Sequence, residues 1–185
     1  MNLCGVTDMG RKAITEFLGK LVEIRLNSVN KYWSKEVTFD YLKQDEKRID
    51  FLQFVPENQL CVDGIEKGVF RGYEVKSCKD DFCSGHGLNF FCEYNYIVMT
   101  MWTYKDLIDR KLLDELPYYV GILLALPKKH KPDKEILKEE FENPSLIPQD
   151  ADVERWKLIP VKKALKTYRK KSLTEMLFCL MRSKH

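Results

Sequence analysis

The longest almost uninterrupted apolar run of this sequence, residues 118–126, constrains the fold more than any other feature. It is far shorter than the roughly 20 residues that cross a membrane, so we expect no membrane segment. A run of this length matches a strand that is buried on both faces. Residues 95–101 form a second run of the same kind. Two such strands predict a central sheet with helices on its faces.

Helices are predicted where apolar residues recur every three or four positions. Ile14, Phe17 and Leu21 belong to such a stripe within residues 7–26, and Thr7 or Asp8 can cap this first helix. The other predicted helices lie at 88–93, at 104–116 and after a capping box formed by Ser172 and Glu175.

Strands are predicted where polar and apolar residues alternate and strand formers are frequent. The segments of this kind are 36–41, 48–54 and 69–77, and 156–165 is a last strand or extended segment. A turn at 44–47 and loops at 56–67 and 78–87 are expected between them. Short links predict an antiparallel meander for the first three strands, whereas helical links predict parallel crossovers later in the chain.

These elements predict an α/β fold with a mixed central sheet and flanking helices. No linker divides the sequence, so we expect one domain over residues 1–185. A charged stretch that contains prolines, at about 128–150, is expected to leave the core as a surface excursion. Residues 155–185 form a basic C-terminal segment.

The overall charge is mild. The chain has 31 lysine and arginine residues and 28 acidic ones, a formal net charge of +3, which alone does not indicate a nucleic-acid partner. Its six cysteines are scattered through a chain that can build a large core, so we expect reduced thiols. The first ten residues hold no apolar signal-peptide core, and we therefore expect a cytoplasmic protein.

The positive charge is concentrated in residues 155–185. This segment has ten lysine or arginine residues and one glutamate, a net charge of +9, so the rest of the chain carries −6. Trp156 and Tyr168 are interleaved with these cations and can stack on bases. The pattern predicts contacts with a phosphate backbone, although basic segments also serve solubility alone. The contact residues that we expect here are Lys162, Lys163, Lys166 and Arg169.

Two acidic residues and a lysine carry the chemistry that we expect. Because side chains alternate along a strand, Glu74 and Lys76 share one face of the third strand, and Asp50 can reach them from the second. Two carboxylates and the backbone carbonyl of Val75 are hard oxygen ligands that suit Mg²⁺ or Mn²⁺. Such an ion polarises a phosphoryl group, and a neighbouring lysine orients or deprotonates the attacking water.

Simpler explanations exist for the same residues. A Glu-x-Lys pair on a strand is commonly an ion pair on a solvated sheet face.

A second candidate site, for zinc, has four soft ligands within a short stretch, but their spacing is not that of paired zinc knuckles. These four residues are Cys78, Cys83, His86 and Cys92, and isolated thiols are the alternative for the cysteines.

Residues 74–82, with the sequence EVKSCKDDF, resemble the E-[VI]-K-S-x-x-x-D-F signature of MmcB-like DNA-repair proteins, a group within the PD-(D/E)xK nuclease superfamily. Residues 48–50 (RID) are similar to the R-x-D motif of that group, and Glu36 is similar to an earlier strand glutamate. Residues 95–98 resemble the strand that follows the connecting helix. The resemblance covers roughly residues 35–100.

The resemblance implies a restriction-endonuclease-like core and metal-dependent hydrolysis of DNA phosphodiester bonds, in repair or processing. Asp50 and Glu74 would be ligands of Mg²⁺ or Mn²⁺, Lys76 the catalytic lysine, and Glu36 a further ligand or an organiser of the site. Two features depart from the family pattern: Ile49 replaces a proline before the aspartate, and residues 85–88 (GHGL) replace a D-x-K-W sequence. The role of the missing lysine passes to His86 or is lost.

The partner that we expect is DNA, with Arg48, Lys79 and His86 as further contact residues beside the site. The alternative is a nucleic-acid-binding module that keeps the fold and has lost catalysis. Both a monomer and a homodimer are compatible with the sequence.

Overall fold

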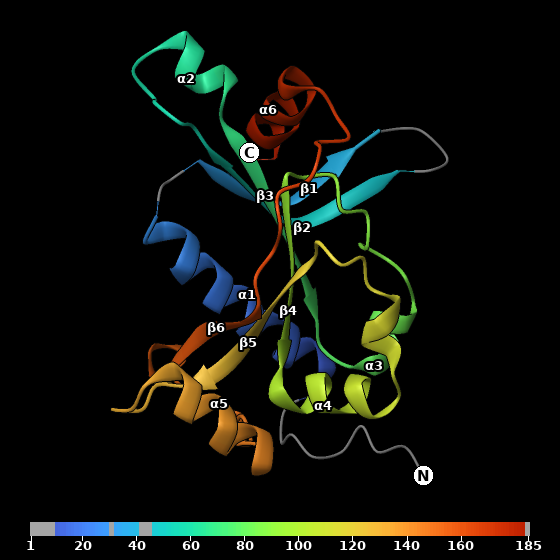
Figure 1. Cartoon of the computed structure of the whole chain (residues 1–185), viewed down its shortest axis with the longest axis vertical. Coiled ribbons are helices and arrows are strands. Elements are labelled where there is room, and N and C mark those ends of the chain that lie inside the picture. Colours follow the sequence, from blue (N-terminus) through green and yellow to red (C-terminus); the bar gives the residue numbers. More distant parts are fainter. Residues whose placement is uncertain (1–9, 30–31, 41–45, 184–185) are drawn as a thin grey trace.

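A computed structural model describes residues 10–29, 32–40 and 46–183 of the protein. Its centre is one six-stranded sheet in which the strands follow the order of the chain, β1-β2-β3-β4-β5-β6 (Figure 1). The strands are β1 (Trp33–Phe39), β2 (Lys47–Val55), β3 (Val69–Lys76), β4 (Tyr94–Thr100), β5 (Gly121–Pro127) and β6 (Trp156–Lys162).

The sheet is mixed, as predicted. β1, β2 and β3 pair antiparallel, and β3, β4 and β5 pair parallel through helical crossovers. β6 returns antiparallel to β5 and forms the far edge of the sheet. Eleven of the fourteen residues of β4 and β5 are buried, which is the burial that apolar central strands require.

Helices lie on both faces of the sheet. The α-helices are α1 (Arg11–Asn27), α2 (Val62–Glu66), α3 (Lys79–Cys83), α4 (Met101–Asp109), α5 (Asp133–Glu142) and α6 (Leu173–Arg182), and two short 3₁₀ helices are η1 (Leu112–Glu115) and η2 (Val153–Arg155). In Figure 1, α1 crosses behind the sheet, whereas α3 and α4 lie on the near side and α6 lies over β1.

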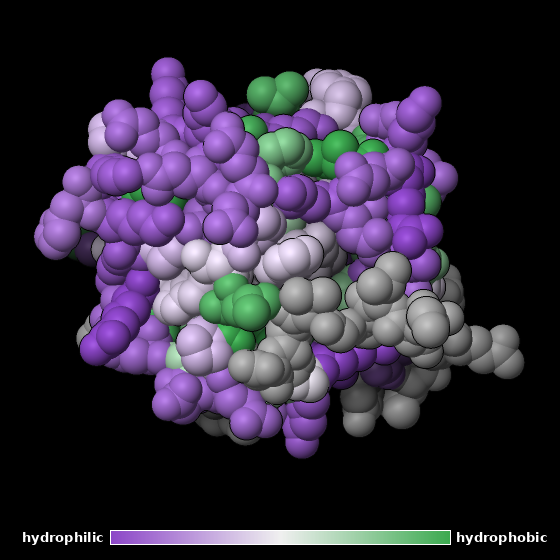
Figure 2. All heavy atoms as spheres, turned by 90° about the horizontal axis from the view of Figure 1, so that it is seen from below, coloured by the Kyte–Doolittle hydropathy of each residue, from purple (hydrophilic) through white to green (hydrophobic). Residues whose placement is uncertain are grey.

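Three apolar clusters form the core. One joins α1 to a sheet face through residues such as Phe17, Leu18 and Trp156. A second joins α4 and α5 to the opposite face and includes Met99 and Leu107. The third cluster packs α6 against the first three strands. Seen from below, the end of the molecule where α4 and α5 lie is mainly hydrophilic, with hydrophobic side chains near its middle and its upper edge (Figure 2).

The structure corrects several predicted elements. The predicted helix at 88–93 is wrong, because the helix in this region is α3, where Asp80 and Asp81 stand in the first turn and favour its positive end. The predicted loop at 56–67 contains α2, and the excursion at about 128–150 contains α5, whose Ile136 is fully buried. Charge and prolines concealed this helix.

Other boundaries shift by a few residues. α4 begins at Met101 rather than at 104, because Thr100 accepts a hydrogen bond from the Thr103 N–H and caps it. The expected caps Thr7 and Asp8, and residues 44–45 of the expected turn, fall outside the described residues. Within the described residues, no helix is both long enough and apolar enough to cross a membrane.

Candidate metal centre

Strands β2 and β3 part at the residues that the sequence singled out. Their ladder runs from Val55 and Val69 to Phe51 and Tyr73 and stops there. Asp50 follows on β2, and its carboxylate Oδ2 accepts a hydrogen bond of 2.8 Å from the backbone N–H of Val75. A side chain thus replaces a backbone carbonyl as the partner of this N–H, and it holds the Asp50 carboxylate against β3.

The other edge of β2 is also irregular at this point. The register of β1 and β2 pairs Lys35 with Phe51 and Val37 with Ile49, but it omits the intervening Glu36 and Asp50. Glu36 has a φ of 53°, a left-handed backbone conformation that is uncommon for residues other than glycine. Its side chain is exposed.

The alternation of β2 breaks at Asp50. Phe51 packs with Tyr73 and Val75 beneath α1, whereas Ile49 lies beside Glu74 on the opposite face. Regular alternation would place Ile49 and Phe51 on the same face. The strand therefore changes face at this residue, and Asp50 reaches sideways to β3.

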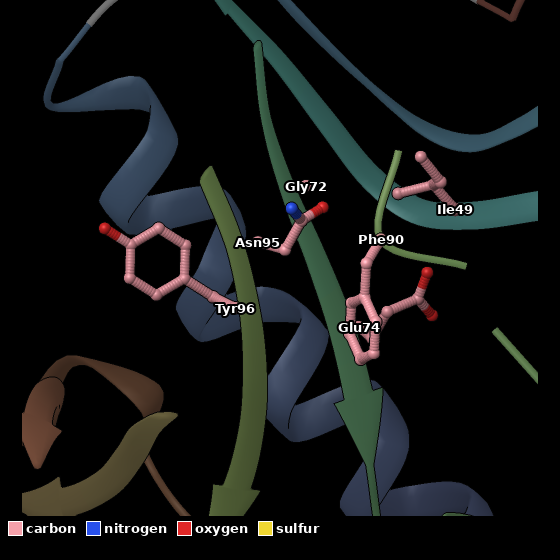
Figure 3. Close-up of a pocket in the computed structure, with 6 residues that line it drawn as sticks. All are labelled: Ile49, Gly72, Glu74, Phe90, Asn95 and Tyr96. Atoms are coloured by element: carbon pink, nitrogen blue, oxygen red, sulfur yellow. The ribbon is translucent and has the colours of Figure 1, made fainter. Parts of the chain in front are cut away.

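Glu74 and Lys76 share the face of β3 opposite Tyr73 and Val75, as predicted. Figure 3 shows the Glu74 carboxylate reaching from β3 towards β2, with the ring of Phe90 beside it. Glu74 is 4% exposed and Lys76 is 3% exposed, so both charged groups are removed from water. Their burial contradicts the alternative of an ion pair on a solvated sheet face.

A loop closes over Glu74. We name residues 84–92 the covering loop; it has positive φ angles at Gly85, Gly87 and Phe90. A Cβ atom on Gly87 would stand 2.3 Å from Glu74 Oε2, so only glycine permits this approach. The hollow that Glu74 and Phe90 line has no room for a water-sized sphere. One carboxylate oxygen, Oε1 of Glu74, is buried without a hydrogen-bond partner among the described residues.

The two carboxyl groups interact directly. Burial raises the pKa of Glu74 well above its ordinary value, and the neighbouring Asp50 charge raises it further. Burial also raises the pKa of Asp50, although the Val75 N–H and Lys76 oppose that effect. Because burial and the Asp50 charge both oppose ionisation of Glu74, folding favours the protonated form of this group.

Lys76 lies within this group and is held by the covering loop. Its Nζ donates a hydrogen bond to the backbone carbonyl of His86. His86 itself is exposed. The covering loop therefore contacts Lys76 through the His86 backbone and not through the imidazole. The lysine lowers the pKa of both carboxyl groups through its charge, which is secondary to burial for each of them.

The donor set suits a small divalent cation. Mg²⁺ commonly takes one or two protein carboxylates and keeps several waters. Asp50 and Glu74 supply two, and the unpartnered Oε1 of Glu74 is an available donor. A divalent cation would also offset the repulsion between the two carboxylates and favour their ionised forms. The hollow beside Glu74 has no room for a water molecule, so the covering loop has to move before an ion can bind there with its waters.

The larger ligand sets are not assembled. In the part of the chain that the structure describes, no three His, Cys, Asp or Glu side chains gather around one point. Glu36 therefore stays apart from Asp50 and Glu74, and the four-residue zinc set is not formed. Cys92 is instead buried against Gly72, and Cys83 is exposed.

The predicted DNA-contacting residues fall into two groups. Arg48, His86, Lys163 and Lys166 are exposed, and Lys162 is half-buried. Lys79 forms an ion pair of 3.4 Å with Asp80. Arg169 differs from the free DNA-contacting cation that was predicted. Its guanidinium lies 2.9 Å from the carboxylate of buried Glu93 and stacks over the ring of Phe70, so it supports the fold.

Sequence reasoning left open whether Asp81 supports the site or caps the following helix, and it missed the close approach of Gly87. Asp81 Oδ2 accepts hydrogen bonds from the backbone N–H and the hydroxyl of Ser77; burial raises the pKa of Asp81, but these bonds lower it below its ordinary value. They fix the chain directly after Lys76. Gly87 was noticed only as a departure from the family pattern. The paired glycines at 85 and 87 were the available signal for a close backbone approach.

Neither a protein-family model nor a curated protein matches this sequence. A solved structure is similar to it: the SPO1766 protein of unknown function from Silicibacter pomeroyi. The match covers 95% of this chain and 84% of that one, with a TM-score of 0.48 and 16% sequence identity.

Proposed function

We propose that this protein is a divalent-metal-dependent DNA nuclease of the PD-(D/E)xK type, as its resemblance to MmcB-like proteins implies. The observation that carries the proposal is the Asp50–Glu74 carboxyl pair, buried beside Lys76, with one Glu74 oxygen left unpartnered. A like-charged pair next to a lysine is costly to bury, and perturbed acids of this kind are typical of functional sites.

Each residue has a defined task in this proposal. Mg²⁺ or Mn²⁺, when bound, would neutralise the phosphate and make a water molecule more acidic. Asp50, fixed by the Val75 N–H, and Glu74, after losing its proton, would hold the ion. Lys76 Nζ would leave the His86 carbonyl and hydrogen-bond to the attacking water or a phosphate oxygen. Glu36 has no task unless β1 moves.

A second candidate function is a nucleic-acid-binding module without catalysis. The observation that favours it is the closed state of the site, in which Glu74 and Lys76 are covered by the covering loop. This alternative predicts DNA binding that depends on salt, ignores divalent metal and survives Glu74→Ala.

The deciding experiment is cleavage of plasmid, single-stranded and branched DNA in Mg²⁺ or Mn²⁺. We expect Lys76→Met and Glu74→Gln to lower the rate at least about 100-fold, the effect of removing one group that acts in the transition state. Lys76→Met keeps the length of the buried side chain, and Lys76→Ala repeats the test. Lys138→Ala, on the exposed side of α5, is the matched control and should cleave at the rate of the wild type.

Thermal unfolding of each variant would establish that the protein remains folded. Equal rates for the wild type and a folded Lys76→Met variant would overturn the proposal. So would an absence of cleavage by the wild type on every DNA form, and the binding module would then be the better description.

A further inference from the structure

The chain between β6 and α6 crosses the molecule as an extended segment, which we name the strap (residues 163–171). It runs beside β4 from the end of β6 to the start of α6 (Figure 1). Backbone N–H groups tie it down: Leu165 donates to the Tyr119 carbonyl (2.9 Å), and Thr167 donates to the Glu93 carbonyl (2.9 Å). The strap is therefore held in one path across the surface.

Alternate residues of the strap face the protein. Arg169 makes its ion pair with Glu93, whose other oxygen accepts the backbone N–H of Phe70 at 2.9 Å. Lys171, at the end of the strap, pairs with Asp40 and Glu175. These inward cations are neutralised, so they fix the strap and are not available to a ligand.

The residues between them face solvent. Lys163, Lys166 and Lys170 are exposed, and none of them forms an ion pair with a described residue. Tyr168 stands between two of these lysines and is 93% exposed, the most exposed of the large apolar or aromatic side chains that the structure describes. No acidic residue occurs from 155 to 171, so this outer edge is uniformly positive.

The end of the strap touches the covering loop. The backbone N–H of Lys170 donates to the Phe91 carbonyl at 3.0 Å, and its Nζ donates to the Asn89 carbonyl at 3.2 Å. Asn89 Nδ2 in turn donates to the carbonyl of Arg48, two residues before Asp50. The positive edge of the strap therefore leads to the loop that lies over the carboxyl pair.

From this arrangement we propose that the strap binds single-stranded DNA, with a base stacked on Tyr168 and phosphates held by Lys163, Lys166 and Lys170. An exposed aromatic ring between cations can stack on any unpaired base, whereas a duplex keeps its bases inside and offers only phosphates. If the protein is the proposed DNA nuclease, this inference also identifies its substrate as single-stranded DNA, and in that respect it rests on the proposed function.

Fluorescence anisotropy of a labelled mixed-sequence 20-nucleotide DNA, with the full chain in EDTA, tests this directly. Tyr168→Ala should raise Kd about 5- to 100-fold, because stacking of one base is lost, and Tyr168→Phe should bind nearly as the wild type does. A 20-base-pair duplex should bind more weakly than the single strand, and Tyr168→Ala should leave its Kd unchanged.

A triple variant tests the lysines. Replacing Lys163, Lys166 and Lys170 by alanine should reduce the slope of log K against log salt by about 2, since each single-strand phosphate contact contributes about 0.7. The matched control replaces Lys12, Lys20 and Lys134, three exposed lysines on α1 and α5, and changes the net charge equally. Its slope should stay within about 0.5 of the wild type.

Unchanged binding of single strands by Tyr168→Ala would overturn the inference, as would equal slopes for the two triple variants or preferential binding of the duplex. The outcome is separable from the proposed function. If the strap binds single strands in EDTA but no DNA is cleaved in Mg²⁺, only the nuclease fails. If DNA is cleaved and Tyr168→Ala leaves the KM for single strands unchanged, only the strap assignment fails.

Discussion

Two buried glutamates, Glu93 and Glu74, stand near opposite ends of β3 and are treated by the fold in opposite ways. Glu93 accepts the Phe70 N–H with one oxygen and the Arg169 guanidinium with the other. Glu74 has a carboxyl group as its neighbour and leaves Oε1 without a partner. A carboxylate that serves structure is fully paired, because an unpaired buried charge costs several kcal/mol.

Glu140 repeats the structural pattern. Its two oxygens accept hydrogen bonds from Lys129 Nζ and from both the hydroxyl and the N–H of Ser145. The described residues thus include three buried glutamates, Glu74, Glu93 and Glu140. Of these three, only Glu74 has a carboxylate oxygen without a hydrogen-bond partner among the described residues. The contrast sets Glu74 apart from the two structural glutamates and supports the proposal that it has a functional role.

The largest expected effect compares the same substitution at the two positions. Glu93→Gln removes half of an ion pair and leaves Arg169 without its partner, so we expect a loss of about 2–3 kcal/mol in the free energy of unfolding. Glu74→Gln removes the repulsion with Asp50 and should be neutral or stabilising without metal. Urea unfolding at pH 7 in EDTA measures both, and equal losses would remove the distinction between the two glutamates.

The second effect is a pH dependence. Because the pKa of Glu74 in the folded protein lies above its ordinary value of 4.5, the protonated group stabilises the fold below that pH, and this contribution is lost as pH rises through the folded pKa. The wild type in EDTA should lose stability with a limiting slope of about 1.4 kcal/mol per pH unit for one proton.

Unfolding curves across pH 5–8 check this slope. In Glu74→Gln the dependence should be flatter, and added Mg²⁺ should oppose it in the wild type because the ion competes with the proton. A wild type whose stability rises over this range, in parallel with the variant, would show that folding does not raise the pKa of Glu74.

The smallest expected effect concerns the covering loop. Gly85 and Gly87 both have positive φ, but a Cβ on Gly85 would meet nothing within 4 Å, whereas one on Gly87 would meet Glu74. Gly85→Ala should therefore cost about 1 kcal/mol for the backbone alone, and Gly87→Ala about 1 kcal/mol more. Thermal unfolding measures the difference, and equal losses would mean that the loop does not press on Glu74.

The central sheet could be predicted because its signal is local. The apolar run of β5 and the alternation of β3 are each contained within a few residues, and the lengths of the links decide which strands run parallel. The common face of Glu74 and Lys76 followed from the same alternation. α5 was missed because its buried positions are few and are surrounded by charge.

The closed state of the site could not be predicted, because it depends on contacts that the pattern of one strand does not encode. The approach of Gly87 to Glu74 needs a backbone path through left-handed angles. The change of face at Asp50 depends on the irregular pairing with β1. Arg169 looked like a free cation in the sequence because its partner Glu93 lies 76 residues away.

The packing of α6 against β1 has a consequence for how the chain is made. Arg182 reaches the carbonyl of Thr38 and Lys171 reaches Asp40 across separations of 144 and 131 residues. During synthesis the β1–β2 hairpin therefore emerges long before the helix that shields its apolar side chains, Val37 and Phe39 among them. Until then the nascent protein carries an uncovered hydrophobic surface, which is prone to aggregation.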